Sequence, residues 1–200
     1  MTLDFYERNG AKFAAQTQPL DMSGFYKPFL AQMRAHGHIL DAGCGSGRDT
    51  KAFLERGYQV TAFDASQTLV NIASAYPGLP VRKMTFQEMA FHNEFDGVWA
   101  CASLLHIPLD ELAGVLVRCA NALKSGGVLY LSFKYGDGQR IAEDGRQFTD
   151  MNEARLTRLL QSDKSLALDT VWTNADSRPG RNEVWLNAIA RKVANTPLGR

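Results

Sequence analysis

The chain has 200 residues, and its 22 Lys and Arg residues nearly balance its 21 Asp and Glu residues, giving a formal net charge of +1. This length suits one α/β domain, and the balanced charge argues against the broad basic field that favours nucleic acid. We find no apolar run long enough to span a membrane and no signal-peptide pattern after Met1, so we expect a cytoplasmic protein without membrane contact. The three cysteines, Cys44, Cys101 and Cys119, lack CxxC spacing and are expected to be reduced thiols.

The first half of the chain predicts helices that alternate with short apolar strands. The expected elements are helices over 4–16 and 23–35, a strand over 38–42, a helix over 50–56, a strand over 59–63, a helix over 67–76 and a short strand over 81–84. Ser23 is a candidate N-cap for the second helix, and Gly57 ends the third. A helix between two strands is the crossover that parallel strands require.

The second half continues this alternation and then ends in two consecutive strands. The expected elements are a strand over 95–101, a helix over 109–123 ended by Ser125-Gly126-Gly127, a strand over 128–133, a helix from the capping-box pair Asp150 and Glu153 to about Gln161, and strands over 166–173 and 183–192. No helix separates the last two strands. We therefore expect them to form an antiparallel pair at a sheet edge.

A glycine-rich turn, LDAGCGSGRD from Leu40 to Asp49, joins the first strand to the following helix. Glycines let a ligand approach bare backbone, and a helix N-terminus presents free N–H groups to an anion. The next strand ends in Asp64, which lies 64 − 43 = 21 residues after Gly43. At about this spacing, a carboxylate on the second strand of a βαβ unit reaches the ribose of a bound nucleoside.

Two residues of this turn argue against NAD or FAD as the ligand. In the dinucleotide fingerprint G-x-G-x-x-G, a third glycine lets helix and strand pack beside the pyrophosphate. Counted from Gly43, that position holds Arg48. Asp41 just before the turn would also repel a pyrophosphate, whereas it suits a ligand that carries an ammonium group.

The same residues resemble the class I methyltransferases that use S-adenosylmethionine (SAM). That family has roughly the pattern acid-x-Gly-x-Gly-x-Gly, followed by an acid at the end of the second strand. Asp41, Gly43, Gly45, Gly47 and Asp64 match this pattern position by position. The resemblance covers nearly the whole chain, including the two closing strands.

The resemblance implies a Rossmann-like, doubly wound α/β fold. Its sheet should have seven strands, mostly parallel, with an antiparallel C-terminal strand and helices on both faces. We expect a single domain over residues 1–200, with an N-terminal helical lid segment at 1–35, an α/β core at 36–193 and a tail at 194–200.

Residues beyond the C-terminal ends of the strands should then form the ligand site. The expected cofactor-binding residues are Tyr6, Asp41, Gly43, Gly45, Arg48, Asp64, Ala65, Thr85, Phe86, Gln87 and Cys101. Tyr6 and Phe13 resemble the helix that covers SAM in this family. Thr85 departs from the family, which often has an acidic residue near the adenine, so backbone groups, Gln87 or Glu88 are the alternatives there.

The methyl acceptor should lie near His106, which follows the fourth strand of the expected sheet. His106 has three interpretations: a general base, since imidazole titrates near neutral pH; a substrate contact without proton transfer; or a structural residue. Lys134, Arg178 and Arg181, together with Arg140, are candidates for binding a carboxylate or phosphate of the acceptor. His36 and His38 supply only two ligands, so no metal site is expected.

The resemblance implies a SAM-dependent methyltransferase that acts on a small molecule, possibly an anionic one, and releases S-adenosylhomocysteine (SAH). Because the fold hosts O-, N-, C- and S-methylation, the acceptor stays open. A tRNA-nucleoside methyltransferase is one alternative, although the chain has no basic arm and nucleic acid is not the expected partner. A non-catalytic, SAM-binding regulatory domain is the other alternative. We expect a monomer or homodimer.

Overall fold

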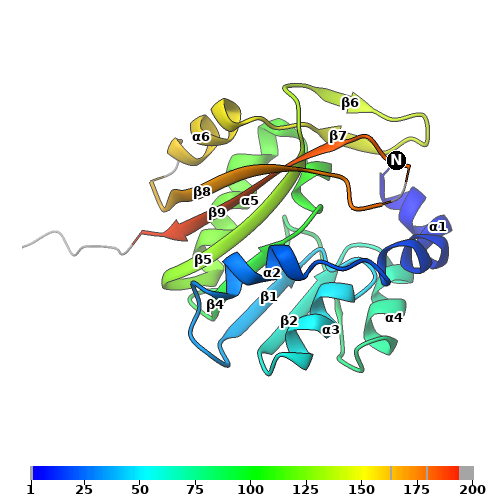
Figure 1. Ribbon diagram of the computed structural model, residues 1–200, viewed down its shortest axis with the longest axis horizontal. Coiled ribbons are helices and arrows are strands. Elements are labelled where there is room, and N and C mark those ends of the chain that lie inside the picture. The colour runs from blue at the N-terminus through cyan, green and yellow to red at the C-terminus, as the bar shows by residue number, and fades with distance from the viewer. Residues whose placement is uncertain (1, 163, 179, 194–200) are drawn as a thin grey trace, which may run out of the picture.

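The computed structural model describes residues 2–162, 164–178 and 180–193. A seven-stranded sheet forms its centre, in the order β3-β2-β1-β4-β5-β9-β8 (Figure 1). The strands are β1 (His38–Ala42), β2 (Gln59–Asp64), β3 (Arg82–Lys83), β4 (Phe95–Ala100), β5 (Leu123–Lys134), β8 (Leu166–Ala175) and β9 (Val184–Lys192). β1 pairs in parallel with β2 and β4, and β9 runs antiparallel to both of its neighbours, β5 and β8. The expected sheet and its antiparallel C-terminal strand are confirmed.

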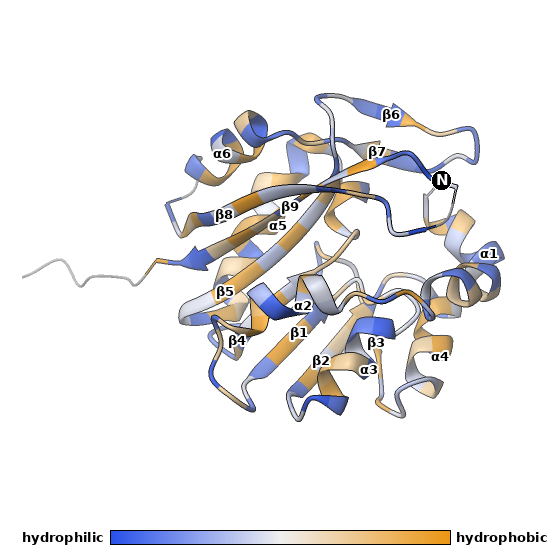
Figure 2. Ribbon diagram, viewed as in Figure 1, coloured by the Kyte–Doolittle hydropathy of each residue, from blue (hydrophilic) through white to orange (hydrophobic). Residues whose placement is uncertain are grey.

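Helices cover both faces of this sheet because successive strand residues point to opposite faces. Ile39 belongs to one apolar core and the adjacent Leu40 to the other. The first core also contains residues of α2 (Ser23–Leu30) and α3 (Arg48–Glu55), and α4 (Gln67–Ala75) packs on β2 nearby. The second contains residues of α5 (Leu109–Ala122) and α6 (Glu153–Gln161). Apolar residues run along the central strands (Figure 2), as burial on both faces requires.

Helices α2 and α6 and strand β5 begin or end at other residues than expected. The helix predicted over 23–35 ends at Leu30, and its N-cap is Met22 rather than Ser23. The helix expected from the Asp150 capping box is capped by Asn152, whose side chain accepts a hydrogen bond from the Arg155 N–H at 3.0 Å. β5 begins at Leu123 because the Gly126-Gly127 step lies in an irregularity of its pairing with β4 instead of ending a helix.

Helix α1 (Thr2–Thr17) and a separate two-stranded hairpin complete the fold. Helix α1 packs against α4, near the C-terminal ends of β1 and β2. A two-stranded hairpin, β6 (Gln139–Ile141) and β7 (Gln147–Thr149), was not expected from the sequence. Its turn contains Asp144-Gly145, with Gly145 at φ +81°, and Asp-Gly is a strong hairpin signal that would have located it. The expected tail at 194–200 lies outside the described residues.

No helix within the described ranges is long and apolar enough to cross a membrane. Cys44, Cys101 and Cys119 are free thiols.

Candidate functional site

A cavity of about 900 Å³ opens at the C-terminal ends of β1, β2, β4 and β5. Its walls include the Gly43–Ser46 turn, the ends of β2 and β4, helix α1, the β6–β7 hairpin and the ends of β8 and β9. Ligands of open α/β sheets bind at this end of the strands. The cavity volume lies toward the upper end of the usual range of roughly 300–1,000 Å³ for small-molecule sites. There is therefore room for a nucleoside-sized ligand together with a second small molecule.

The turn after β1 is held tightly against the loop after β4. Gly43 has φ +72°, and a β-carbon added to it would lie 2.6 Å from Cβ of Ser103. The Ser103 hydroxyl in turn donates a hydrogen bond to the Ala42 carbonyl at 2.8 Å. Only glycine satisfies both the left-handed backbone and this close approach. The backbone of the turn, rather than its side chains, thus forms the floor of the cavity.

Asp64 ends β2 and lines the cavity beside this turn. Its Oδ2 accepts a hydrogen bond from the Gly45 N–H at 2.9 Å, and its Oδ1 accepts one from the Ser66 N–H at 2.9 Å. Burial raises the pKa of the carboxyl, and the backbone hydrogen bonds from Ser66 and Gly45 oppose that shift. Each oxygen keeps acceptor capacity for a ligand hydroxyl.

Nearly all residues expected to bind the cofactor line this cavity. Those that do are Tyr6, Gly43, Gly45, Arg48, Asp64, Ala65, Thr85, Phe86, Gln87 and Cys101. Asp41 does not line it: the residue is 2% exposed, and its carboxyl accepts a hydrogen bond from the Thr50 hydroxyl at 2.6 Å. Burial and the nearby charge of Asp49 raise the pKa of Asp41. Any influence of Asp41 on a ligand therefore acts through Thr50 and the turn.

Asp49 is a buried carboxylate that sequence reasoning did not single out, because an acid in the first turn of a helix is ordinary. Arg48 binds it through two N–H···O contacts of 2.6 and 2.9 Å. Tyr26 and Trp99 also donate to it, at 2.6 and 2.8 Å. Although burial opposes the shift, these donors lower the pKa of Asp49. The carboxylate joins α2, α3 and β4 behind the glycine turn and fixes the Arg48 side chain in the cavity wall.

The segment after β3 forms another part of the wall. Phe86 packs edge-on against Phe63, with ring centroids 5.3 Å apart, so it belongs to the core as well as to the cavity. Glu88 does not line the cavity; its carboxylate accepts hydrogen bonds from the Thr85 backbone and hydroxyl at 2.8 and 2.9 Å. Of the groups considered for an adenine contact, Thr85 and Gln87 face the cavity.

Helix α1 lines the cavity through residues that include Tyr6, Phe13 and Thr17. The Tyr6 hydroxyl is 2.8 Å from Nε2 of His106. Phe13 lies over the turn, where a β-carbon on Gly45 would be 3.2 Å from its ring. Thr17 donates a hydrogen bond to the Ser46 hydroxyl at 2.9 Å. One helix thus contacts both the glycine turn and the residue expected near the acceptor.

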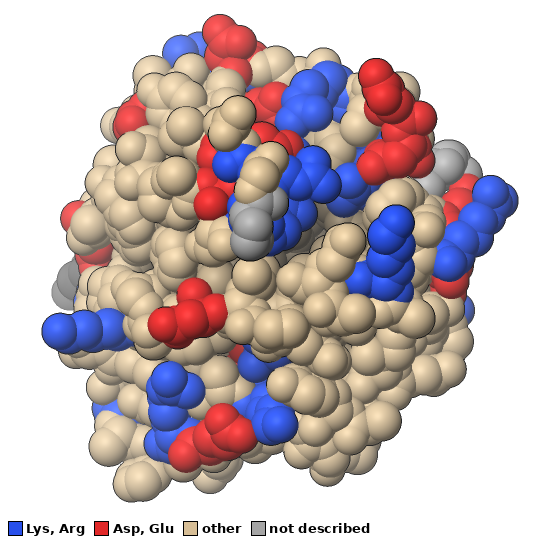
Figure 3. Space-filling model, turned by 45° about the vertical axis from the view of Figure 1, so that its right-hand side comes forward, with Lys and Arg blue, Asp and Glu red and all other residues tan. Residues whose placement is uncertain are grey.

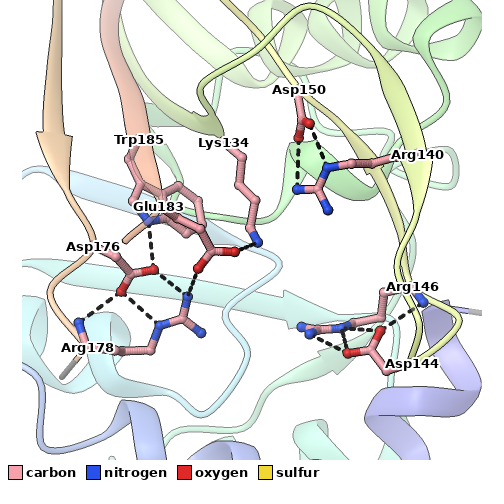
Figure 4. Close-up of polar contacts among 9 residues, drawn as sticks. All are labelled: Lys134, Arg140, Asp144, Arg146, Asp150, Asp176, Arg178, Glu183 and Trp185. Atoms are coloured by element: carbon pink, nitrogen blue, oxygen red, sulfur yellow. Dashed lines mark hydrogen bonds and ion pairs between the residues drawn. The ribbon is translucent and has the colours of Figure 1, made fainter. Parts of the chain in front are cut away.

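Four basic residues at the end of the cavity near His106 are each paired with a carboxylate (Figure 4). The pairs are Lys134 with Glu183, Arg140 with Asp150, Arg146 with Asp144 and Arg178 with Asp176. The Arg178 guanidinium donates two hydrogen bonds to the Asp176 carboxylate, at 2.9 and 2.5 Å. Although burial opposes the shift, these bonds hold the pKa of Asp176 well below its ordinary value. Basic and acidic atoms accordingly lie side by side on the molecular face in Figure 3. The sequence predicted Lys134, Arg140 and Arg178 at this site but neither Arg146 nor the four carboxylate partners.

The predicted acceptor residues His106, Lys134, Arg178 and Arg181 all line this end of the cavity. Arg181 is exposed, and its N–H donates to the Arg178 carbonyl at 3.3 Å. Within the described residues we find no group of three or more His, Cys, Asp or Glu side chains arranged to hold a metal ion.

Comparison with protein families places residues 39–127 in a match to a methyltransferase domain. Among curated proteins, the ubiquinone biosynthesis O-methyltransferase of Xanthomonas campestris pv. campestris is 36% identical over 101 residues, covering 47% of this chain and 41% of that protein. The enzyme of the same name from Idiomarina loihiensis is 32% identical over 101 residues, with the same coverage. The matched region therefore spans less than half of these relatives.

Solved structures with a similar fold extend the likeness to almost the entire chain. The Burkholderia thailandensis 1,6-didemethyltoxoflavin-N1-methyltransferase, with bound 1,6-didemethyltoxoflavin and SAH, has a TM-score of 0.77 at 24% identity, covering 94% of this chain and 84% of its own. A [4+2]-cyclase, SpnF, has a TM-score of 0.74 at 15% identity, covering 96% and 95%. At these identities the likeness concerns the fold.

Proposed function

We propose that this chain is a class I SAM-dependent methyltransferase that transfers the methyl group of SAM to a small-molecule acceptor and releases SAH, as its match to a methyltransferase domain and its fold support. The observation that carries the proposal is the joint geometry of the glycine turn and Asp64. A turn of bare backbone and a carboxylate bound to it face one cavity large enough for both reactants. The expectations of a cytoplasmic location and of a monomer or homodimer stay predictions.

The cavity residues suit the parts of SAM in an order that follows the sheet. Asp64 would accept hydrogen bonds from the ribose hydroxyls, as carboxylates at this position do in nucleoside-binding βαβ units. The Gly43–Gly45 backbone would lie along the methionine part, with Arg48 and Cys101 beside it. Thr85, Phe86 and Gln87 would border the adenine. Ala65 and Tyr6 would complete the enclosure of the nucleoside.

When bound, SAM supplies an activated methyl group on a sulfonium. The protein's own contribution is to align the acceptor with that methyl group and to keep water out. Helix α1 supports this role because Tyr6 and Phe13 cover the cavity from the solvent side. Lys134, His106, Arg178 and Arg181 would contact the acceptor at the other end.

A small-molecule acceptor is favoured by the charge distribution. Four of the cations at the acceptor end, Lys134, Arg140, Arg146 and Arg178, are paired with carboxylates, whereas binding to RNA requires a surplus of positive charge for phosphates. The relatives' names, ubiquinone biosynthesis O-methyltransferase and didemethyltoxoflavin N1-methyltransferase, refer to small molecules. Because the match spans under half of the curated relatives, no acceptor is carried over from them.

The test is SAH formation from SAM in three reactions: with a metabolite extract, with a tRNA pool, and with neither. A small-molecule enzyme produces SAH with the extract alone. Production with the tRNA pool alone would support the tRNA-nucleoside alternative. Tight SAM binding by calorimetry without turnover in either pool would support a regulatory SAM-binding domain, and a protein that does not bind SAM would contradict all three.

A further inference from the structure

His106 has both ring nitrogens engaged. Nδ1 lies 2.8 Å from the carbonyl oxygen of Gln147. Since a carbonyl oxygen can only accept a hydrogen bond, Nδ1 carries the proton. The Nε2 lone pair of the neutral ring then accepts a hydrogen bond from the Tyr6 hydroxyl, 2.8 Å away. The nitrogen that could act as a base is therefore occupied by the protein's own tyrosine.

The surroundings of the ring keep it neutral. Burial lowers the pKa of His106 to about 4, and the positive charges of Arg146 and Lys134 act in the same direction. The Gln147 carbonyl and Asp144 oppose the shift. The groups facing His106 thus come from α1, β5 and the β6–β7 hairpin, and their combined effect favours the neutral ring.

Aromatic contacts extend from His106 in both directions. Its ring centroid lies 4.9 Å from that of Phe148 in β7 and 5.5 Å from that of Tyr6. Tyr6 lies 5.2 Å from Phe13, which packs over Gly45. The His106–Tyr6 hydrogen bond is the polar contact in this row. It links His106, in the wall at the acceptor end, to Tyr6, whose ring packs against Phe13 over the glycine turn.

Gln147 holds helix α1 at a second point. Its backbone N–H donates a hydrogen bond to the Thr2 hydroxyl at 2.8 Å, while its carbonyl holds His106. Next to it, the Arg146 guanidinium lies over the Phe5 ring, 4.2 Å from its centroid. Helix α1 and the β6–β7 hairpin are therefore joined at the cavity by direct contacts, and His106 contacts both of them.

We infer that His106 is a positioning residue: it holds Tyr6, and with it helix α1, across the cavity, and it does not take a proton from the acceptor. This inference rests on the proposed methyl transfer. The inference also narrows the proposed function, because it restricts the acceptor to groups that present a lone pair without deprotonation by His106. Such groups are a ring nitrogen, an uncharged amine or an oxyanion. The reacting lone pair then forms the bond to the methyl carbon, and the electrons of the broken carbon–sulfur bond stay on sulfur.

The first experiment measures SAH affinity by titration calorimetry in wild type and four variants. Tyr6→Phe removes the donor, His106→Leu removes the acceptor, and a double variant removes both, whereas His106→Gln keeps an oxygen that can accept from Tyr6. Each of the first two variants should weaken SAH binding about tenfold, as expected for the loss of one partly buried hydrogen bond. The double variant should bind no more weakly than either, and His106→Gln should recover most of the affinity.

Hydrogen exchange gives a readout that does not depend on turnover. With SAH bound, amides of residues 2–17 and 139–149 should exchange faster in Tyr6→Phe and His106→Leu than in wild type, and at near wild-type rates in His106→Gln. If wild type binds SAH but both single variants keep its affinity and protection, the inference is overturned while the proposed function stands. A wild-type protein that fails to bind SAH overturns the proposed function instead.

The pH profile separates positioning from base catalysis once the extract yields an acceptor. A positioning role predicts that His106→Gln and wild type have kcat profiles of the same shape, and that His106→Leu mainly raises the KM for SAM. General-base catalysis contributes roughly 10²–10⁴-fold. A kcat loss of that size in His106→Gln, shrinking as pH rises, would refute the inference.

Discussion

The backbone N–H of Gly45 donates a hydrogen bond to Oδ2 of Asp64 at 2.9 Å. This contact joins the glycine turn after β1 to the acid that ends β2, so the two halves of the sequence pattern form one structural unit. Asp64 is therefore more than a ligand group, because the same carboxylate fixes the turn on which the ligand is proposed to lie. Removing it should affect both binding and the order of the turn.

Replacing Asp64 with alanine should weaken SAH binding at least tenfold. The variant would lose the hydrogen bonds that the ribose hydroxyls donate to the ionised carboxylate, worth on the order of 1.5–3 kcal/mol each. Titration calorimetry checks this, with Glu94→Ala as the matched control, since Glu94 is an exposed acid that precedes β4 at the opposite end of the sheet. Equal affinity in wild type and Asp64→Ala would overturn the assignment of Asp64.

Asp49→Ala should destabilise the fold far more than a surface substitution. It leaves Arg48 without its carboxylate partner and the buried donors of Tyr26 and Trp99 unpaired. Breaking a buried pair in this way costs about 3–5 kcal/mol. Urea unfolding of the SAM-free protein measures the loss, with Asp110→Ala at the exposed start of α5 as the control. A loss in the free energy of unfolding below about 1 kcal/mol would mean that water satisfies the donors that Asp49 leaves unpaired.

The parts of the fold that sequence predicted are those where one local signal decides the outcome. Alternating apolar strands and the turn at Gly43 locate β1 and β2, and the closing pair of strands sets the antiparallel edge. The β5 boundary was wrong because Gly126-Gly127 is compatible with a helix end and with a strand irregularity. Pairing with β4 decides between them, and that contact is distant in sequence.

In the candidate site, too, features set by local sequence could be predicted, whereas contacts between segments distant in sequence could not. The glycine turn and Asp64, which line the cavity, could be predicted because their spacing is fixed by the βαβ unit, whereas Asp41 is buried away from the cavity. The partner of Lys134 could not be predicted, since Glu183 meets it only after β9 pairs with β5. Asp176 lies only two residues before Arg178, so that pair was a local signal that the sequence analysis missed. His106 was placed at the right end of the cavity, but its bonds to Tyr6 and Gln147 depend on α1 and β7 folding over it.

The buried His106 should make stability pH-dependent in acid. Its pKa is about 4 in the folded protein against an ordinary value of 6.5, so between these values the unfolded chain binds a proton that the folded protein does not. Stability should be fully retained above about pH 6.5 and should fall toward pH 4, by up to about 3 kcal/mol.

His106→Gln should remove this component of the pH dependence. The comparison with wild type is needed because the raised pKa values of Asp41 and Asp64 act in the opposite sense, stabilising the folded protein as pH falls. Urea unfolding at pH 5 and pH 7 gives the two slopes. If the variant and wild type lose the same stability between these pH values, His106 titrates normally in the folded protein.

The ion pairs at the acceptor end make the anionic-acceptor hypothesis testable in two directions. Arg178 is bound by Asp176 and lies 3.6 Å from Glu183, whereas Arg181 is exposed on the same loop. If the acceptor carries a carboxylate or phosphate, the double change of Arg178 and Arg181 to glutamine should raise its KM roughly tenfold and spare SAM affinity.

Asp176→Asn should lower that KM, because the amide keeps an acceptor for Trp185 but releases Arg178 from its carboxylate. Both effects should shrink at high salt, where charge interactions at a partly exposed site are screened. With a neutral acceptor, or if neither substitution changes the KM of an anionic one, Arg178 serves only to pair with Asp176 and Glu183 at the rim, and Arg181 has no part in acceptor binding.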